Sequence, residues 1–212
     1  MSRFDVLKSL VRSAARASGE RLSKVSAVAG VRQAIDEVRA RRSTLTEAAI
    51  ARAITHGVPT LAAASVSLRG GRVVLDLDYK SRGDTPGETL AVSLIPEQAR
   101  FAPRGAKEVI FSVEPPEAVN DARVRELVGA LAAAIARALW GPVLGERTVD
   151  EQAMVDREGA RLRADLRSVP AVRAALEGSP LAMALEIISI ESFAIEDRVL
   201  RIVLALPFPG AP

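Results

Sequence analysis

The chain has 212 residues, of which 49% are apolar and 26% are charged, a composition typical of a globular protein with a sizeable core. It contains no cysteine, which excludes disulfides, thiolate metal sites and cysteine nucleophiles. No stretch approaches the roughly 18 continuous apolar residues of a membrane-spanning helix. The N-terminus lacks the apolar run of a signal peptide. The expected location is therefore the cytoplasm, including peripheral association with the inner face of the membrane.

The positive charge is concentrated in an N-terminal arm, residues 1–42. This arm holds ten lysines and arginines against four acidic residues, whereas the rest of the chain is net negative. Its first 17 residues follow the spacing of an amphipathic helix, and the next predicted helix, 22–42, is also basic. Such an arm is typical of binding to an anionic membrane, although a helix packed on its own domain or on a second subunit has the same pattern. The candidate membrane-surface residues are Arg3, Phe4, Leu7, Lys8, Val11 and Arg12.

After a junction at 41–44, a short helix is expected to run to about residue 55. Thr44 is a candidate N-cap, and Glu47 three residues later would complete a capping box. The glycine and proline of the sequence Gly-Val-Pro at 57–59 end this helix.

The stretch 61–113 predicts consecutive β-strands. Apolar and polar residues alternate on both sides of Gly70-Gly71, which is a strong signal for a hairpin because glycine adopts positive φ without a steric penalty. Residues 89–95 are apolar on both faces and predict a strand that is covered on both sides. Pro96 interrupts it, with a bulge before it resumes, and a further strand is expected at 108–114.

A long apolar helix is predicted at 121–140, with Asn120 as its cap and Gly141-Pro142 as its end. A charged helix is expected over 150–168, followed by a short helix from Pro170 to about 177. Two strands, 183–193 and 199–207, complete the chain, and the second is apolar enough to be central or covered.

The sequence offers no catalytic constellation, so we expect no enzyme activity, cofactor or metal. His56 is the only histidine, and the sequence contains no serine in a nucleophile elbow for which it could act as the base. Asp76 and Asp78 share one strand face and could act as a pair of ligands or as acid and base, but such residues more often form the solvent-exposed face of a sheet. Glu186 and Glu191 are interpreted in the same way. Aromatic residues make up only 3% of the chain, which makes nucleic acid an unlikely partner.

Three stretches carry a resemblance to a known family: LTEAAIARAI at 45–54, VSLRGGRVVLDLDY at 66–79 and LEIISIESFAIEDRVLRIVLAL at 185–206. Together they resemble the small bacterial members of the tubular lipid-binding (TULIP) superfamily, including the actinobacterial cell-envelope lipid-binding family. The resemblance covers roughly 43–206. It implies a curved antiparallel sheet wrapped on a long helix, enclosing an apolar groove that takes acyl chains. Family members are usually exported, whereas this chain shows no export signal.

The predicted architecture is thus one α+β domain, 43–212, with a curved antiparallel sheet packed on long helices and preceded by the basic helical arm 1–42. The first functional hypothesis is non-enzymatic binding of lipid or another long apolar ligand at a membrane surface. The alternative is a scaffold or self-association module, such as a homo-oligomer, whose apolar surfaces a protein partner covers. The residues predicted to line the ligand groove are Val92, Leu94, Val109, Phe111, Leu127, Leu131 and Ile135.

Overall fold

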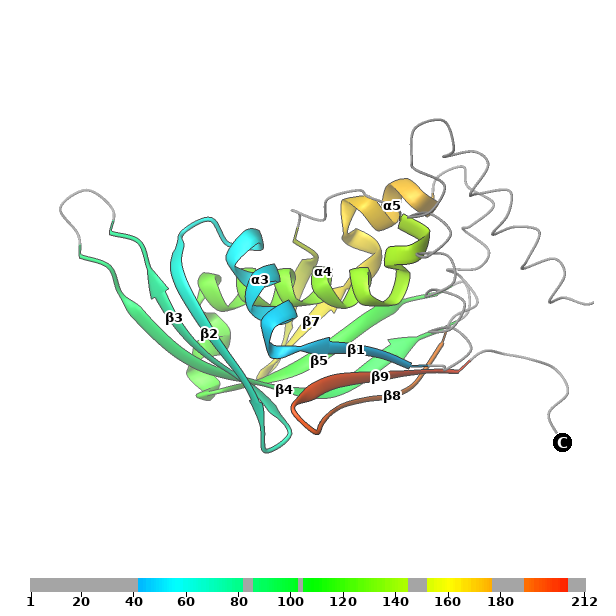
Figure 1. The fold of residues 1–212 in the computed structure, drawn as a ribbon, viewed down its shortest axis with the longest axis horizontal. Coiled ribbons are helices and arrows are strands. Elements are labelled where there is room, and N and C mark those ends of the chain that lie inside the picture. The colour runs from blue at the N-terminus through cyan, green and yellow to red at the C-terminus, as the bar shows by residue number, and fades with distance from the viewer. Residues whose placement is uncertain (1–41, 82–85, 103–104, 145–151, 177–188, 206–212) are drawn as a thin grey trace, which may run out of the picture.

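The computed structural model describes residues 42–81, 86–102, 105–144, 152–176 and 189–205. Over these residues the chain has an α+β fold with antiparallel sheets, which confirms the predicted class (Figure 1). The strands are β1 (Arg42–Thr46), β2 (Leu61–Arg69), β3 (Arg72–Tyr79), β4 (Thr89–Phe101), β5 (Lys107–Glu114), β6 (Met154–Glu158), β7 (Arg161–Asp165), β8 (Ser189–Glu196) and β9 (Val199–Ala205). The helices are α3 (Glu47–Gly57), α4 (Ala122–Leu144), α5 (Pro170–Leu176) and the 3₁₀ helices η1 (Pro116–Asn120) and η2 (Leu166–Ser168).

The strands form two sheets rather than the single sheet expected. A six-stranded sheet has the order β2-β3-β4-β5-β7-β6, and a three-stranded sheet has the order β1-β9-β8. The second sheet arises because residues 42–46 form a strand that pairs with β9, where Ser43 lies opposite Ile202. The sequence had predicted a junction at 41–44, followed by a helix. The last described strand is therefore central in its sheet, as its continuous apolar sequence predicted.

The β2–β3 hairpin is confirmed, with Gly70 at φ +57° and Gly71 at φ +73° in its turn. The predicted bulge in β4 is also present, as a register shift between Pro96 and Gln98. The expectation that β4 is covered on both sides is wrong for its first half. Val92 and Leu94 are buried, whereas Thr89 and Ala91 on the opposite face are exposed, since no element within the described residues covers that side of the sheet there.

Helix α3 is capped by Thr46 and not by Thr44, which belongs to β1. The Thr46 hydroxyl accepts a hydrogen bond from the backbone N–H of Ala49 at 3.3 Å. Glu47 does not complete a capping box. Its carboxylate instead accepts the N–H of Leu68 on β2 at 2.9 Å and pairs with Arg198 at 2.8 Å, so it joins α3 to both sheets.

Helix α4 begins one residue later than predicted and continues past Pro142. The Asp121 carboxylate, rather than Asn120, accepts the first-turn N–H of Arg123 at 2.9 Å. Proline has no N–H to donate to the carbonyl four residues before it, which here is that of Ala138. The Ser43 hydroxyl of β1 donates to that carbonyl at 2.9 Å, which explains how the helix continues through a proline.

Residues 154–168 do not form the predicted charged helix but the β6–β7 hairpin and η2. Gly159 turns the chain at φ +64°. Leu162 and Ala164 are buried, and they alternate with Arg161 and Arg163 on the outer face. This period-two pattern is typical of a half-buried strand, and the high charge content obscured it.

The core lies around α4, which contacts α3, β1, β6 and β7 (Figure 1). Helix α3 packs on α4 and on β2. The approach between the helices is close, because a Cβ atom on Gly57 would lie 2.7 Å from the Cβ of Ala130. Small residues at this crossing therefore set how tightly the helical layer packs over the sheets.

Candidate functional site

The structure brings the seven predicted groove residues together in one place. They come from β4, β5 and α4, and each is at most 3% exposed. All belong to a single hydrophobic core cluster. A side chain that lines an open groove exposes part of its surface to that groove, so these residues form a packed core in this structure. The seven are Val92, Leu94, Val109, Phe111, Leu127, Leu131 and Ile135.

The middle of α4 is unusually slender, because its buried surface is largely alanine. These alanines are at most 8% exposed, which shows that the neighbouring elements close over them. Small side chains facing large ones can leave a groove or pack shut, and here they pack shut. The alanines concerned are Ala130, Ala132, Ala133, Ala134 and Ala136.

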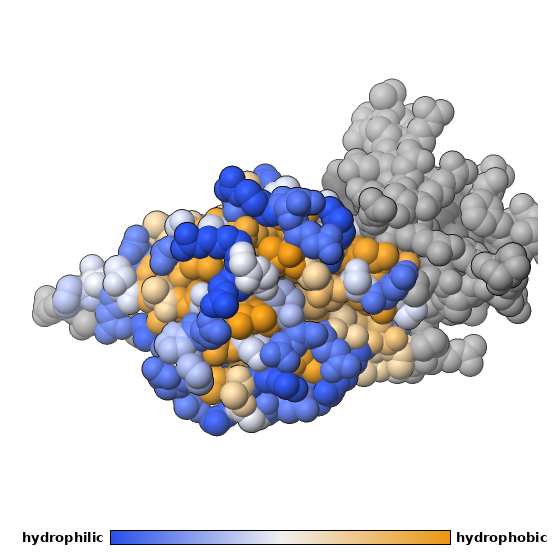
Figure 2. Space-filling model, turned by 90° about the horizontal axis from the view of Figure 1, so that it is seen from below, coloured by the Kyte–Doolittle hydropathy of each residue, from blue (hydrophilic) through white to orange (hydrophobic). Residues whose placement is uncertain are grey.

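Five partly buried apolar side chains that pack against the core lie on the second half of β4 and on β8, two strands that run beside each other. We call the line along which they lie the β4–β8 seam. Its five residues are half-buried and pack against the core. Figure 2 shows apolar surface among the hydrophilic groups on the lower face of the molecule, the face on which the β8–β9 hairpin lies. The seam consists of Ala99, Phe101, Ile190, Phe193 and Ile195.

No backbone ladder closes the seam between β4 and β8, both of which are fully described. Strand β4 pairs with β3 and β5, and β8 pairs with β9, so the two neighbours belong to different sheets. Side chains make the contact instead, as in the edge-to-face packing of Phe111 on Phe193, whose ring centroids are 5.6 Å apart. The sheets can therefore separate at this line without loss of strand pairing.

Aromatic and basic side chains meet at the Phe101 end of the seam. The Phe101 ring stacks on Trp140 of α4, with centroids 6.1 Å apart. The Lys107 ammonium lies 5.6 Å from the centroid of the same Phe101 ring and donates to the carbonyl of Ala102 at 2.6 Å. Trp140 is 1% exposed, and its indole N–H finds no acceptor among the described residues. This end of the seam thus places Lys107 and an indole N–H without an acceptor among the described residues against the same Phe101 ring.

A second polar cluster surrounds Tyr79, at the C-terminal end of β3. Burial raises the pKa of Tyr79 to about 12, and its hydroxyl has no hydrogen-bond partner among the described residues. The Arg123 guanidinium lies 5.2 Å from the ring centroid and pairs with Asp121 at 2.7 Å and Glu88 at 2.6 Å. Hydrogen bonds from Arg123 lower the pKa of Asp121. The charges of this cluster are therefore compensated internally.

The outer face of β4, β5, β7 and β6 carries ion pairs rather than a basic patch. Arg163 pairs with Asp156 at 3.1 Å and with Glu108 at 3.7 Å, and Arg161 pairs with Glu97 at 3.3 Å. A face whose arginines are already paired with carboxylates is poorly suited to bind phosphates.

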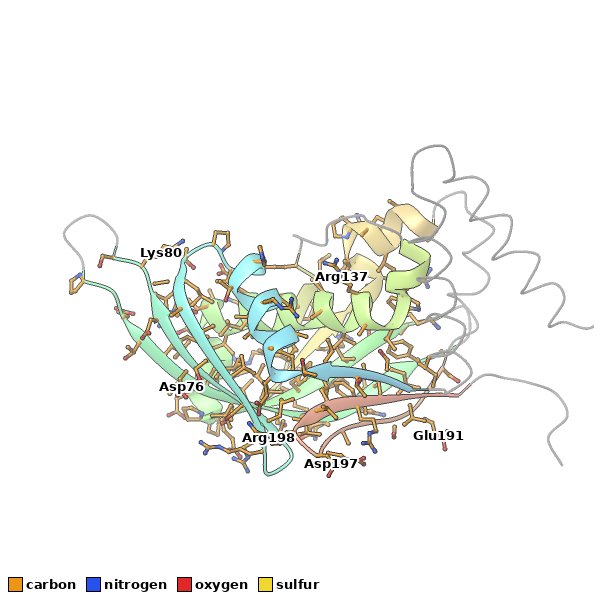
Figure 3. All side chains as sticks on the ribbon, viewed as in Figure 1. Asp76, Lys80, Arg137, Glu191, Asp197 and Arg198 are labelled. Atoms are coloured by element: carbon orange, nitrogen blue, oxygen red, sulfur yellow. The ribbon has the colours of Figure 1, made fainter. Side chains whose placement is uncertain are left out.

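The histidine and acidic residues considered for catalysis lie on three different elements of the described surface. His56 is exposed in the last turn of α3, and Asp76 and Asp78 are exposed on the outer face of β3. Figure 3 shows Asp76 and Glu191 on different elements, pointing away from the body of the molecule. The described residues contain no group of three or more histidines and acidic residues that could hold a metal ion. Glu186 lies outside these residues.

Sequence reasoning missed the seam, although part of its signal was present. Phe193 and Ile195, at the end of the predicted strand 183–193 and just beyond it, alternate with less apolar neighbours, which marks an inward face. Phe101 and Trp140 also stand out in a chain with so few aromatic residues. The juxtaposition of β8 with β4 could not be predicted, since it depends on the division of the strands between two sheets.

The arm and its six candidate membrane-surface residues lie outside the described residues. Within the described part, no helix has the length and apolar character needed to cross a membrane. Comparison with protein-family models, with curated proteins and with solved structures finds no match to the chain. The candidate site therefore rests on the geometry of the seam.

Proposed function

We propose that the protein binds lipid or another long apolar ligand between its two sheets, without catalysing a reaction on it. The observation that carries this proposal is the β4–β8 seam, where core side chains are half-exposed and no backbone hydrogen bonds join the neighbouring strands. An acyl chain that enters there would replace apolar contacts between the two sheets with apolar contacts between each sheet and the acyl chain. Because both sheets keep their ladders, opening costs side-chain packing but no strand pairing.

One predicted groove residue, Phe111, contacts the seam directly. Phe193 of the seam packs on Phe111 of the groove set, so its movement would expose the interior to the seam. The slender alanine surface of α4 offers the least side-chain bulk for a ligand to displace. In this proposal the packed core is the ligand-free arrangement, and the curved sheet and groove implied by the TULIP resemblance describe the ligand-bound one.

The basic arm supports binding of the protein at a membrane surface. An amphipathic helix with Phe4, Leu7 and Val11 opposite arginines and a lysine suits the surface of an anionic membrane, from which a lipid could be taken. We place this activity at the cytoplasmic face of the inner membrane. The charge pattern of residues 1–42, rather than the folded domain, supports this part of the proposal.

Extraction of the purified protein with organic solvent, followed by mass spectrometry, tests the proposal. We expect a lipid or another long-chain compound at a substantial molar ratio. Phe193→Trp should fill the seam and reduce this ratio while leaving the circular dichroism spectrum unchanged. Val74→Trp is the matched control, because Val74 is equally half-buried but lies on the outer face of β3.

Two results would contradict ligand binding. One is an extract without long-chain compounds, combined with no uptake of added phospholipid. The other is equal ligand content in the Phe193→Trp and Val74→Trp proteins, which would place the ligand elsewhere. If the ligand-free protein were also a stable oligomer that dissociates on substitution of seam residues, self-association would replace ligand binding as its function.

A further inference from the structure

We propose that two copies of the chain associate through strand β2, so that their six-stranded sheets join edge to edge. Strand β2 is the outermost strand on one side of that sheet and pairs with β3 (Figure 1). The second copy lies antiparallel to the first and is related to it by a two-fold axis, the commonest symmetry of homodimers. Strand β3 separates this edge from β4, so the surface is distinct from the β4–β8 seam.

The direction of the β2 backbone groups follows from the hairpin turn. A two-residue glycine turn closes the hairpin at the pair Arg69 and Arg72, which exchange backbone hydrogen bonds. Bonded and non-bonded pairs then alternate along an antiparallel ladder, so Leu68 and every second residue before it direct their N–H and C=O groups to the free edge. Leu68 confirms this direction, because its N–H donates to the Glu47 carboxylate at 2.9 Å and not to β3.

The outward groups of Ala64 and Val66 are available to another strand. Their N–H and C=O groups on this side have no hydrogen-bond partner among the described residues. Helix α3 packs on β2, yet both residues keep part of their surface exposed, so the helix does not cover them completely. A row of unpaired backbone groups along a strand is a template for the addition of a further strand.

Strand β2 also lacks the features that protect a free edge. It contains no proline and, before its last residue, no charge. Its bulge lies at the first residues, which leaves 63–69 regular. The opposite edge of the same sheet is protected, because β6 carries Asp156, Arg157 and Glu158 in succession. Pairing with another chain is therefore favoured at β2 and opposed at β6.

The strand is self-complementary around Ser65. When Ser65 of one copy faces Ser65 of the other, Ala64 and Val66 of each copy exchange hydrogen bonds with Val66 and Ala64 of the other. The side chains that face each other next to this pair are small, since Ala63 then lies opposite Ser67. No like charges meet among these residues, so the pairing itself does not oppose a symmetric dimer.

Charges flank this pairing in complementary positions. Arg69 is exposed at the end of β2, as are Asp76 and Asp78 on the same face of β3, and none of them has an ion-pair partner among the described residues. Within one copy, Arg69 is four residues from Ser65, which lies opposite Asp76, a separation of about 14 Å along the strand. In the dimer, Arg69 of one copy lies diagonally beside Asp78 of the other, with only the small Ala63 between them for the long arginine to cross.

Sedimentation velocity of the full-length protein over a concentration series tests the dimer. Val66→Pro removes an outward N–H and places a ring against the incoming strand, while the hydrogen bonds from β2 to β3 stay intact. We expect it to weaken dimerisation about ten-fold or more, the factor that about 1.4 kcal/mol produces. Val155→Pro is the matched control, because Val155 is also half-buried and also directs its N–H away from its ladder, on the protected edge β6.

Exchange of the charges gives a second test that does not depend on proline. Arg69→Glu and Asp78→Lys should each weaken the dimer several-fold, because each brings like charges together at the junction. The double variant restores opposite charges and should recover most of the lost affinity. Both side chains are exposed, so the circular dichroism spectra should match that of the unmodified protein.

Three results overturn association through β2. They are a full-length protein that stays monomeric, a dimer that Val66→Pro and Val155→Pro affect equally, and single charge variants whose effects the double variant does not reverse. Phe193→Trp should leave the dimer intact, and its dissociation would place the interface at the seam instead. Val66→Pro should keep any long-chain compound found in the organic extract, so that failure of the dimer and failure of ligand binding are distinguished.

Discussion

Ser43 donates a hydrogen bond to the carbonyl of Ala138, 95 residues later, at 2.9 Å. The bond joins β1 of the small sheet to the last turns of α4, at the one carbonyl that Pro142 cannot satisfy. Ser43 is 8% exposed, so solvent does not readily replace it. A hydroxyl from a distant strand thus substitutes for a backbone donor that the helix lacks.

Ser43→Ala should lower the free energy of unfolding by about 1–3 kcal/mol, because it leaves a partly buried carbonyl without a donor. Pro142→Ala restores the helical N–H. Ser43→Ala should therefore destabilise the Pro142→Ala protein less than it destabilises the unmodified protein. Urea denaturation of both single variants and the double variant gives the coupling energy. Additive effects of the two substitutions would contradict this relationship.

Leu131→Ala should cost about 2–5 kcal/mol, as expected for a fully buried leucine in a packed core. Arg137→Ala, on the exposed side of the same helix, is the control and should change stability by less than about 0.5 kcal/mol. Both values come from denaturant unfolding. A cost near ~1 kcal/mol at Leu131 would instead indicate that this side chain lines a groove in the ligand-free protein.

Gly57→Ala should destabilise the fold by about 1–3 kcal/mol, because its new methyl group would meet the Cβ of Ala130 at 2.7 Å. Ala130→Gly removes that methyl group at a cost of about 0.5–1 kcal/mol for a glycine within a helix. The double variant should be more stable than the sum of the two single effects, as thermal unfolding can measure. Strict additivity would show that α3 moves away from α4 to accept the methyl group.

Tyr79 should ionise at a higher pH than a free tyrosine, and the stability that its burial provides should be lost at high pH. Burial raises its pKa to about 12, against about 10 for an unfolded tyrosine. The folded state therefore holds this proton to higher pH than the unfolded state does. The resulting stabilisation is complete below about pH 10 and is lost as the pH rises to about 12. Because Tyr79 is the only tyrosine, absorbance at 295 nm follows its ionisation directly, and a midpoint near 10 in the folded protein would refute the prediction.

Removal of residues 1–18 should reduce co-sedimentation with anionic vesicles. Each basic residue near an anionic surface contributes roughly 1 kcal/mol, and added salt should weaken binding of the full chain. Replacement of Arg3, Lys8 and Arg12 with glutamine, which keeps the apolar stripe, is the matched variant. Equal binding by the full-length and truncated proteins would remove the arm from the proposed function.

Local chemistry made the β2–β3 hairpin and the bulge in β4 predictable. Gly70-Gly71 and Pro96 impose backbone conformations that few alternatives satisfy, and both predictions are confirmed. The β6–β7 hairpin was misread as a helix because its outward positions carry arginines and carboxylates, so that only Leu162 and Ala164 kept the strand period visible. Gly159, which lies between β6 and β7, was the available turn signal.

Long-range pairing could not be read from the chain in the same way. The strand β1 contains two threonines and a serine and looked like a junction, because its strand character depends on β9 being its neighbour. The position of Trp140 against Phe101 likewise follows from α4 crossing the sheet. The sequence therefore indicated which residues would be inside, while the position of the β4–β8 seam depended on contacts between distant segments.

The pairing of β1 with β9 has a consequence for synthesis on the ribosome. Thr44 emerges early, but its partner Arg201 emerges only near the end of the described chain. Until then the nascent polypeptide holds an unpaired edge and an incomplete apolar layer, which are the features that promote premature association. We expect a chaperone that captures exposed apolar segments to associate with the growing chain, and to be released only after Val203 has cleared the exit tunnel.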